Sequence, residues 1–104
     1  MFKDMGQFVK QAREMQAKLQ SLQEELGRRE LEGTAGGGMV TVTLNGRGEM
    51  LRVHIDPQAV ADVEMLEDLV LVAVRDAQQK AADLAKREMS KLTGGLNLPF
   101  KMPF

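Results

Sequence analysis

The chain has 104 residues, of which 43% are hydrophobic and 28% are charged, with a formal charge of −1 at pH 7. This composition is typical of one globular domain and leaves no room for a second of full size. The absence of cysteine excludes disulfides, thiolate metal sites and a cysteine nucleophile, and we expect a cytoplasmic protein. No apolar stretch reaches the roughly 18 residues of a membrane helix, so neither membrane insertion nor secretion is predicted. Only 4% of residues are aromatic, so partner subunits are expected to complete the core.

Charge is distributed unevenly along the chain. Residues 1 to 29 carry six basic and four acidic side chains, and residues 80 to 104 carry five and two. The segment between them carries three basic and nine acidic side chains. The two ends are therefore basic and the middle is acidic, and pairing two copies would double both basic ends.

The first predicted element is a long helix over residues 3 to 26. Its apolar residues recur with alternating spacings of three and four, the heptad pattern of a helix that packs against one other long helix, in the same chain or in another copy. Gly27 is expected to end the helix in a left-handed turn. The seam consists of Met5, Phe8, Ala12, Met15, Leu19, Leu22 and Leu26.

A three-stranded antiparallel sheet is predicted next, because the apolar spacing changes to strict alternation between about residues 29 and 56. Its first strand covers Arg29 to Thr34 and is joined by three glycines to a hairpin that turns at residues 45 to 48. With Gly46 and Arg47 as a two-residue loop, Val42 is expected opposite Leu51 and Val40 opposite Val53. The remaining core-facing residues of the hairpin are Leu44 and Ile55.

A second long helix is predicted over residues 63 to 92. Asp56 and Pro57 are suited to start a short helical turn, and Asp62 can cap the long helix that follows. The segment Leu69 to Val74 is apolar nearly all round, so we expect it to be buried on several sides, by the sheet and by a partner. Thr93 and the two glycines after it end the helix.

These elements predict an α+β fold with a long N-terminal helix, a three-stranded antiparallel sheet and a long C-terminal helix. One domain covers residues 1 to 95, and residues 96 to 104 form a tail that is flexible or docked on a partner. Each long helix measures roughly 35 Å or more, which exceeds the width of a domain of this size. The helices are therefore expected to project or to pair.

No catalytic set is evident. The only histidine, His54, lies on the polar face of a predicted strand with no nucleophile or metal-ligand partner placed beside it. The glycines at 36 to 38 are followed by neither a helix nor a Lys-Ser/Thr pair, as a phosphate-binding loop would require. A helix dipole explains the acidic cluster without a metal ion; that cluster is Asp62, Glu64, Glu67 and Asp68. We therefore predict no enzyme activity, cofactor, metal site or small-molecule substrate.

The basic residues of the helices have two interpretations. Lys3, Lys10 and Arg13 form a stripe opposite the first seam, with few acidic residues among them. The second helix carries a similar face, but Asp76 and Asp83 stand four residues before two of its cations, as in ordinary salt bridges. Its cations are Lys80, Lys86, Arg87 and Lys91. The stripes are either solvated helix faces or sites for nucleic-acid phosphates.

Five segments, taken with their order and spacing, resemble the YbaB/EbfC family of bacterial nucleoid-associated proteins across essentially the whole chain. They are EGTAGGG at 32–38, NGRGE at 45–49, IDP at 55–57, MLEDL at 65–69 and MSKLTGGL at 89–96. The resemblance implies a cytoplasmic, nucleoid-associated homodimer shaped like tweezers that binds double-stranded DNA with little sequence preference and alters its conformation.

The family's first and last helices are associated with DNA contact, which on this chain implies eight cations: Lys3, Lys10, Arg13, Lys18, Lys80, Lys86, Arg87 and Lys91. In the arrangement that we expect, the sheets and the apolar run of the second helix form the dimer body, and the long helices form two arms. The seam and dimer residues are then Met5, Phe8, Met15, Leu19, Leu22, Leu69, Val70 and Val74.

The rival interpretation is a protein-interaction module, because a hairpin flanked by two coiled-coil helices is also how a prefoldin-like chaperone subunit is built. The mildly acidic pI of about 5.8 favours this rival, and the basic ends and the family resemblance favour DNA. A chaperone is expected to suppress aggregation of an unfolded client and to ignore DNA. An enzyme is the third possibility and would need a cofactor or partner to supply acid–base groups.

Overall fold

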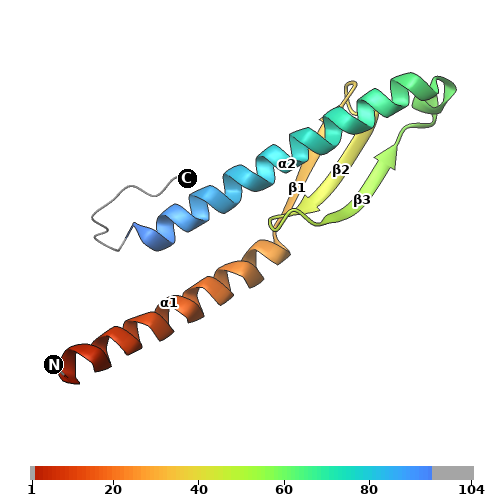
Figure 1. The fold of residues 1–104 in the computed structure, drawn as a ribbon. Coiled ribbons are helices and arrows are strands. Elements are labelled where there is room, and N and C mark those ends of the chain that lie inside the picture. Colours follow the sequence, from red (N-terminus) through yellow and green to blue (C-terminus); the bar gives the residue numbers. More distant parts are fainter. Residues whose placement is uncertain (1, 95–104) are drawn as a thin grey trace.

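The computed structural model describes the backbone of residues 2–94 and the side chains of residues 5–94, and it confirms the expected α+β order of elements (Figure 1). Lys3 and the tail at 96–104 lie outside the described side chains. The molecule is elongated, with extents of 71 × 24 × 16 Å. Its elements are α1 (Phe2–Arg28), β1 (Glu30–Ala35), β2 (Val40–Asn45), β3 (Met50–Ile55), the 3-10 helix η1 (Pro57–Ala61) and α2 (Val63–Thr93).

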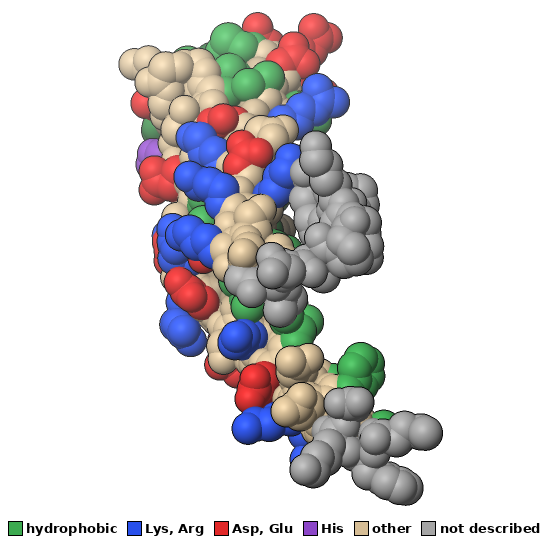
Figure 2. Space-filling model, turned by 90° about the vertical axis from the view of Figure 1, so that its left-hand side faces the viewer, with side chains coloured by type: hydrophobic (Ala, Val, Ile, Leu, Met, Phe, Trp, Pro, Cys, Tyr) green, Lys and Arg blue, Asp and Glu red, His purple; other side chains and the backbone are tan. Residues whose placement is uncertain are grey.

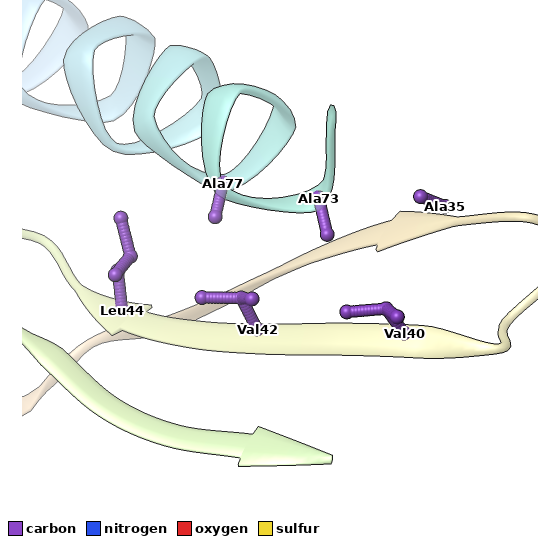
Figure 3. Packing of buried hydrophobic residues seen from close by; sticks show 6 residues of the cluster. All are labelled: Ala35, Val40, Val42, Leu44, Ala73 and Ala77. Atoms are coloured by element: carbon purple, nitrogen blue, oxygen red, sulfur yellow. The ribbon is translucent and has the colours of Figure 1, made fainter. Parts of the chain in front are cut away.

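Helix α2 lies on one face of the antiparallel sheet, whose strand order is β1-β2-β3 (Figure 1). Val40, Val42 and Leu44 of β2 point toward Ala73 and Ala77 of α2 (Figure 3), and all five side chains are at most 2% exposed. Because the helix presents alanines here, its backbone lies close to the sheet. The core is therefore a thin layer between one helix and two strands.

Helix and sheet approach each other closely at Gly33 in β1. A Cβ atom at this position would lie 2.1 Å from the carbonyl oxygen of Ala73 and 2.4 Å from the backbone nitrogen of Ala77. Both distances are far inside van der Waals contact, and both involve backbone atoms, which have no rotamer to change. Only glycine fits between this strand and this helix.

Strand β3 lies outside the cover of α2. An α-helix is about 10 Å across, and strands lie about 4.8 Å apart, so one helix covers two strands. Val53 and Leu51 share the α2 side of the sheet with Val42, yet they remain 47% and 44% exposed. The sheet therefore has an uncovered apolar strip along β3.

Helix α1 projects from the end of the sheet and contacts the rest of the chain through its last two turns (Figure 1). Leu22 and Leu26 of α1 pack with Leu84 of α2, and all three are buried. The N–H of Gly46, in the β2–β3 loop, donates to the carbonyl oxygen of Leu26 at 2.8 Å. This bond satisfies a carbonyl group that a helix end leaves free and fixes α1 against the hairpin.

The prediction that Gly27 ends α1 in a left-handed turn is wrong. The helix continues to Arg28, and Gly27 lacks a positive φ angle. A Cβ at Gly27 would lie 2.7 Å from the guanidinium of Arg47, which packs over the helix at this point. The helix therefore continues past Gly27 beneath a side chain that is distant in the sequence.

The predicted hairpin register is also wrong, by two residues. Val42 lies opposite Val53 and Val40 opposite Ile55, with an irregularity between Thr43 and Leu44. Asn45 and Glu49 pair across a three-residue loop, and Gly48 within it has a φ of 86°. A shift of two residues keeps every side chain on its expected face, so the predicted core face is confirmed.

The predictions of a glycine turn at 36 to 38 and of two aspartate caps are confirmed. The glycines at 36 to 38 connect β1 to β2, with φ angles of 63°, 66° and 95°. The Asp56 carboxylate accepts a hydrogen bond from the Gln58 N–H at 2.8 Å, and that of Asp62 accepts one from the Met65 N–H at 3.1 Å. These bonds start η1 and α2 where the sequence predicts.

Candidate nucleic-acid interface

The basic residues of α1 are free in the described part of the chain. Lys10, Arg13 and Lys18 are exposed, and none of them forms an ion pair with another described side chain. Helical geometry places Lys10 and Arg13 opposite the apolar seam, facing away from α2. These cations stand on a helix that projects beyond the sheet, where a large polyanion has access to them.

Lys80 differs from the other predicted site residues because it contacts polar groups of its own chain. Its ammonium group donates to the carbonyl oxygen of Glu32 at 2.8 Å and lies 3.3 Å from the carboxylate of Asp76. The same carboxylate accepts the Thr34 N–H at 3.1 Å. Lys80 and Asp76 therefore bind backbone groups at the outer edge of β1, which occupies Lys80 within the fold.

The pKa of Asp76 is lowered from its ordinary value of 3.8. The first cause is the hydrogen bond from the Thr34 N–H, and the second is the hydrogen bond from Lys80. Both contacts favour the ionised carboxylate. The network at the edge of β1 therefore depends on the charge of Asp76.

Of the two salt bridges expected within α2, only the first is found. The Asp76–Lys80 pair is confirmed, but Asp83 accepts a hydrogen bond from the Gln79 amide at 3.0 Å and forms no ion pair with Arg87. Asp83 and Arg87 do share a shallow surface depression, together with Leu31, Lys80 and Lys86. Among the described side chains Lys86 and Arg87 have no acidic partner within salt-bridge distance, so they join the free cations of α1.

Lys91 of α2 lies near Lys18 of α1, across a groove between the two helices. It lies 3.2 Å from the carboxylate of Glu88 and is still 74% exposed. Lys91 and Lys18 line the same open groove between α2 and α1, where Glu25 and Glu88 also lie. The fold thus brings one predicted site residue of each helix together, in the company of two acidic residues.

Cations gather over the middle of one face of the molecule, interspersed with acidic side chains (Figure 2). Five of the eight predicted site residues are exposed and form no ion pair with another described side chain. They are Lys10, Arg13, Lys18, Lys86 and Arg87. Cations without partners are those available to neutralise phosphates. The electrostatic surface therefore suits an extended polyanion better than a small ligand.

A second surface is apolar and lies beside β3. A groove on α2 is lined by Leu66, Val70, Leu71 and Val74 with Glu67. The prediction that the run Leu69 to Val74 is buried on several sides does not hold within one chain, because Leu71 is 48% exposed. Val70, Leu69 and Val74 are half-buried against the sheet. A strip of apolar side chains is left open.

Sequence reasoning missed Leu51 and Val53 of β3 as surface residues. Their alternation placed them correctly on the core face of the sheet, but the pattern does not reveal how many strands a single helix covers. Counting helices against strands gives the missing signal, because one helix for three strands leaves one strand uncovered.

The predicted seam residues of α1 differ in burial. Leu22 is buried, Met15 is half-buried, and Met5, Phe8 and Leu19 are exposed.

The remaining chemical candidates are isolated. His54 is exposed on the face of the sheet away from α2, opposite Thr41, and within the described chain no hydrogen bond joins it to a nucleophile. The described residues contain no group of three or more histidine, aspartate or glutamate side chains arranged to hold a metal ion. No helix among them combines the length and apolarity needed to cross a membrane.

These features define an α+β protein with a single sheet layer, one covering helix and a projecting cationic helix. The chain belongs to the YbaB/EbfC DNA-binding family, whose model matches residues 1–96. It is 52% identical to a nucleoid-associated protein of Granulibacter bethesdensis, covering 98% of this chain and 99% of that one. A nucleoid-associated protein of Gemmatimonas aurantiaca is 46% identical, with 100% and 98% covered.

A crystal structure of an uncharacterized protein from Helicobacter pylori has the same fold, with a TM-score of 0.78. Its sequence is 24% identical, and the match covers 90% of this chain and 98% of that one. The family resemblance expected from the five sequence segments is confirmed. The family is a DNA-binding one, and nothing in these relationships supports the chaperone-like alternative.

Proposed function

We propose that this protein binds double-stranded DNA as a homodimer, with little sequence preference, and alters the conformation of the duplex. The observation that carries the proposal is the set of exposed cations without acidic partners on the two long helices, which we named above as Lys10, Arg13, Lys18, Lys86 and Arg87. They are spread along elements tens of ångströms long, as contacts to a phosphate backbone require. Sequence preference then comes mainly from how easily the DNA deforms.

We propose the homodimer from the uncovered apolar surface, which combines the strip along β3 with the groove on α2. Leu51 and Val53 of β3 and Leu71 of α2 are each more than 40% exposed, and burying such side chains contributes about 25 cal/mol per Å². A second copy of the same surface matches it in both apolarity and length. Pairing through this strip leaves α1 and the C-terminal half of α2 free as arms.

The proposed role is one of binding rather than catalysis, in the nucleoid, as the names of the relatives suggest. His54, the sole histidine, lies on a strand away from the cationic helices. A pI of about 5.8 is compatible with DNA binding because the acidic residues concentrate in the middle of the chain. The charge that a duplex meets is that of the arms.

The test is a fluorescence-anisotropy titration of the dimer against two unrelated duplexes of about 30 base pairs, at low and near-physiological salt. We expect similar affinity for both, with log K falling against log salt by about 0.9 for each phosphate neutralised. A preference of about tenfold for one duplex indicates base or shape readout instead. Absence of binding at low salt contradicts the proposal.

A pair of matched variants tests the arms. Arg87→Ala removes a free cation of α2, whereas Arg52→Ala removes an arginine that is paired with Glu30 on the sheet. We expect Arg87→Ala to weaken binding to both duplexes and to reduce the salt slope by about 0.9 per arginine lost from a phosphate contact. Arg52→Ala is expected to leave the slope unchanged. Equal effects of the two variants show that net charge, rather than the arms, determines binding.

A further inference from the structure

The apolar seam of α1 is covered over only part of its length. Leu22 and Leu26 are 8% and 3% exposed because α2 packs on them, whereas Met5 and Phe8, on the same face, are 66% and 73% exposed. Leu19 is 37% exposed, and Met15, between Leu19 and Phe8, is half-buried. The open part of the seam, from Leu19 to Met5, extends over about 21 Å of helix, at 1.5 Å per residue.

Helix α2 ends where this open part begins. Leu92, in its last turn, packs with the cluster that buries Leu22, and Lys91 and Lys18 line one groove across the two helices. The helix ends at Thr93 with Gly94 as its cap. The ten residues that follow therefore leave the fold at the foot of the open seam.

Those ten residues have the pattern and the length to cover it. Extended chain advances about 3.1 Å per residue, so ten residues reach about 30 Å, more than the open seam requires. Every second residue is apolar, and the residues between include two prolines, which suit an extended conformation and oppose a helix. The apolar residues are Leu96, Leu98, Phe100, Met102 and Phe104.

We propose that residues 95 to 104 dock in extended form along the α1 seam of the same chain, from Leu19 toward Met5. The competing occupant is α1 of a second copy, which has the same seam. The tail has the advantage of attachment: a short tether gives an effective concentration in the millimolar range, far above that of a second chain in dilute solution. Docking joins the projecting arm to the end of α2 and stiffens it.

Cysteine cross-linking tests the proposal, because the chain contains no cysteine of its own. When the tail is extended, Pro99 lies about 15 Å beyond Gly94, level with Gln11, which flanks the seam about 12 Å from Leu19. We pair Pro99→Cys with Gln11→Cys in one protein and with Lys10→Cys in another. Lys10 is adjacent in sequence but lies on the opposite side of the helix, so it serves as the matched control.

With a short bifunctional thiol reagent, we expect the Gln11 pair to link within one chain about tenfold faster than the Lys10 pair. Equal rates overturn the proposal, and so does a Pro99–Gln11 link that joins two chains. Rapid linking of two chains by Gln11→Cys alone also overturns it and assigns the seam to a second α1.

Amide hydrogen exchange provides an independent measurement on the full-length chain. Phe100→Ser removes an apolar contact from the tail, and Lys101→Ser changes its neighbour on the side away from the seam. We expect Phe100→Ser to accelerate exchange across residues 5 to 19, and Lys101→Ser to leave it unchanged. Identical exchange in the two variants contradicts docking.

Discussion

At the scale of single residues, helix α2 contacts the backbone of strand β1 directly. Gly33 lets β1 approach α2 so closely that a methyl group has no space. Asp76 and Lys80 bind two backbone groups at the edge of the same strand. Each of these residues has a polar or small side chain that looks ordinary in the sequence, and each gives a measurable prediction.

Gly33→Ala is expected to destabilise the protein by about 3 kcal/mol or more, because its methyl group meets backbone atoms that cannot move without separating helix from sheet. Gly6→Ala is the matched control, since a Cβ there meets nothing within 4 Å. That change is expected to stabilise α1 slightly, as alanine favours helix over glycine. Denaturant unfolding measures both, and equal stability of the two variants contradicts the close approach.

Asp76→Asn is expected to lower the melting temperature at neutral pH, because the variant loses the charge that binds Lys80. The carboxyl pKa is lowered in the folded chain, so its contribution is complete above the ordinary value of 3.8 and is lost as the pH falls below it. Thermal melts of both proteins on either side of that pH give the measurement. A difference that persists unchanged at low pH contradicts this assignment.

Two residue-level expectations failed because a local sequence pattern is compatible with more than one contact. Gly27 was consistent with a helix end and Asp83 with a salt bridge to Arg87, since both interpretations use only sequence neighbours. The actual partner of Gly27 is Arg47, twenty positions away, and Asp83 bonds Gln79 on the preceding turn. Local patterns do not rank such alternatives, because competing contacts on a helix surface differ by a few tenths of a kcal/mol.

At the scale of elements, the sequence was far more informative. Heptad spacing, alternation and two aspartate caps predicted every helix and strand in the right order, and the bounds predicted for the two long helices and the first strand lie within two residues of those observed. The register of the hairpin failed because loop length determines it, and a sequence with glycines at 46 and 48 is compatible with loops of two or three residues. The candidate site could be predicted only as a set of cations on helices.

Helix α1 is held by a small cluster, which makes its attachment easy to test. Leu84→Ala removes a side chain that is 2% exposed between the helices and is expected to cost about 2–5 kcal/mol locally. We expect faster amide exchange in α1 while β2 stays protected. Val72→Ala, at a position 52% exposed, serves as the control and is expected to change stability by less than about 0.5 kcal/mol. Uniform acceleration across the sheet contradicts a separate attachment.

At the scale of the whole molecule, a single chain leaves part of its apolar surface uncovered. Helix α2 covers two strands, and Leu51 and Val53 of β3 stay exposed. The homodimer that we propose covers this strand with a second copy, which supplies apolar contacts that a chain with 4% aromatic residues lacks on its own. The sequence could not show which strand is left bare, because alternation looks the same on covered and uncovered strands.

Val53→Glu tests this arrangement directly. The side chain is 47% exposed in the single chain, so a carboxylate at this position stays solvated and the monomer is expected to fold. In the dimer that we propose, the carboxylate is buried without a partner, at a cost of several kcal/mol. Sedimentation velocity is expected to show a monomer with native circular dichroism. A dimer that survives the change places the interface elsewhere.

The two edges of the sheet also differ in what they permit. The outer edge of β1 is closed by Asp76 and Lys80, while that of β3 has no such cover among the described residues. A sheet with two open edges can add neighbours without end and grow into a filament. With one edge closed, a chain that joins a second copy edge to edge has used its only opening, so growth stops at a pair.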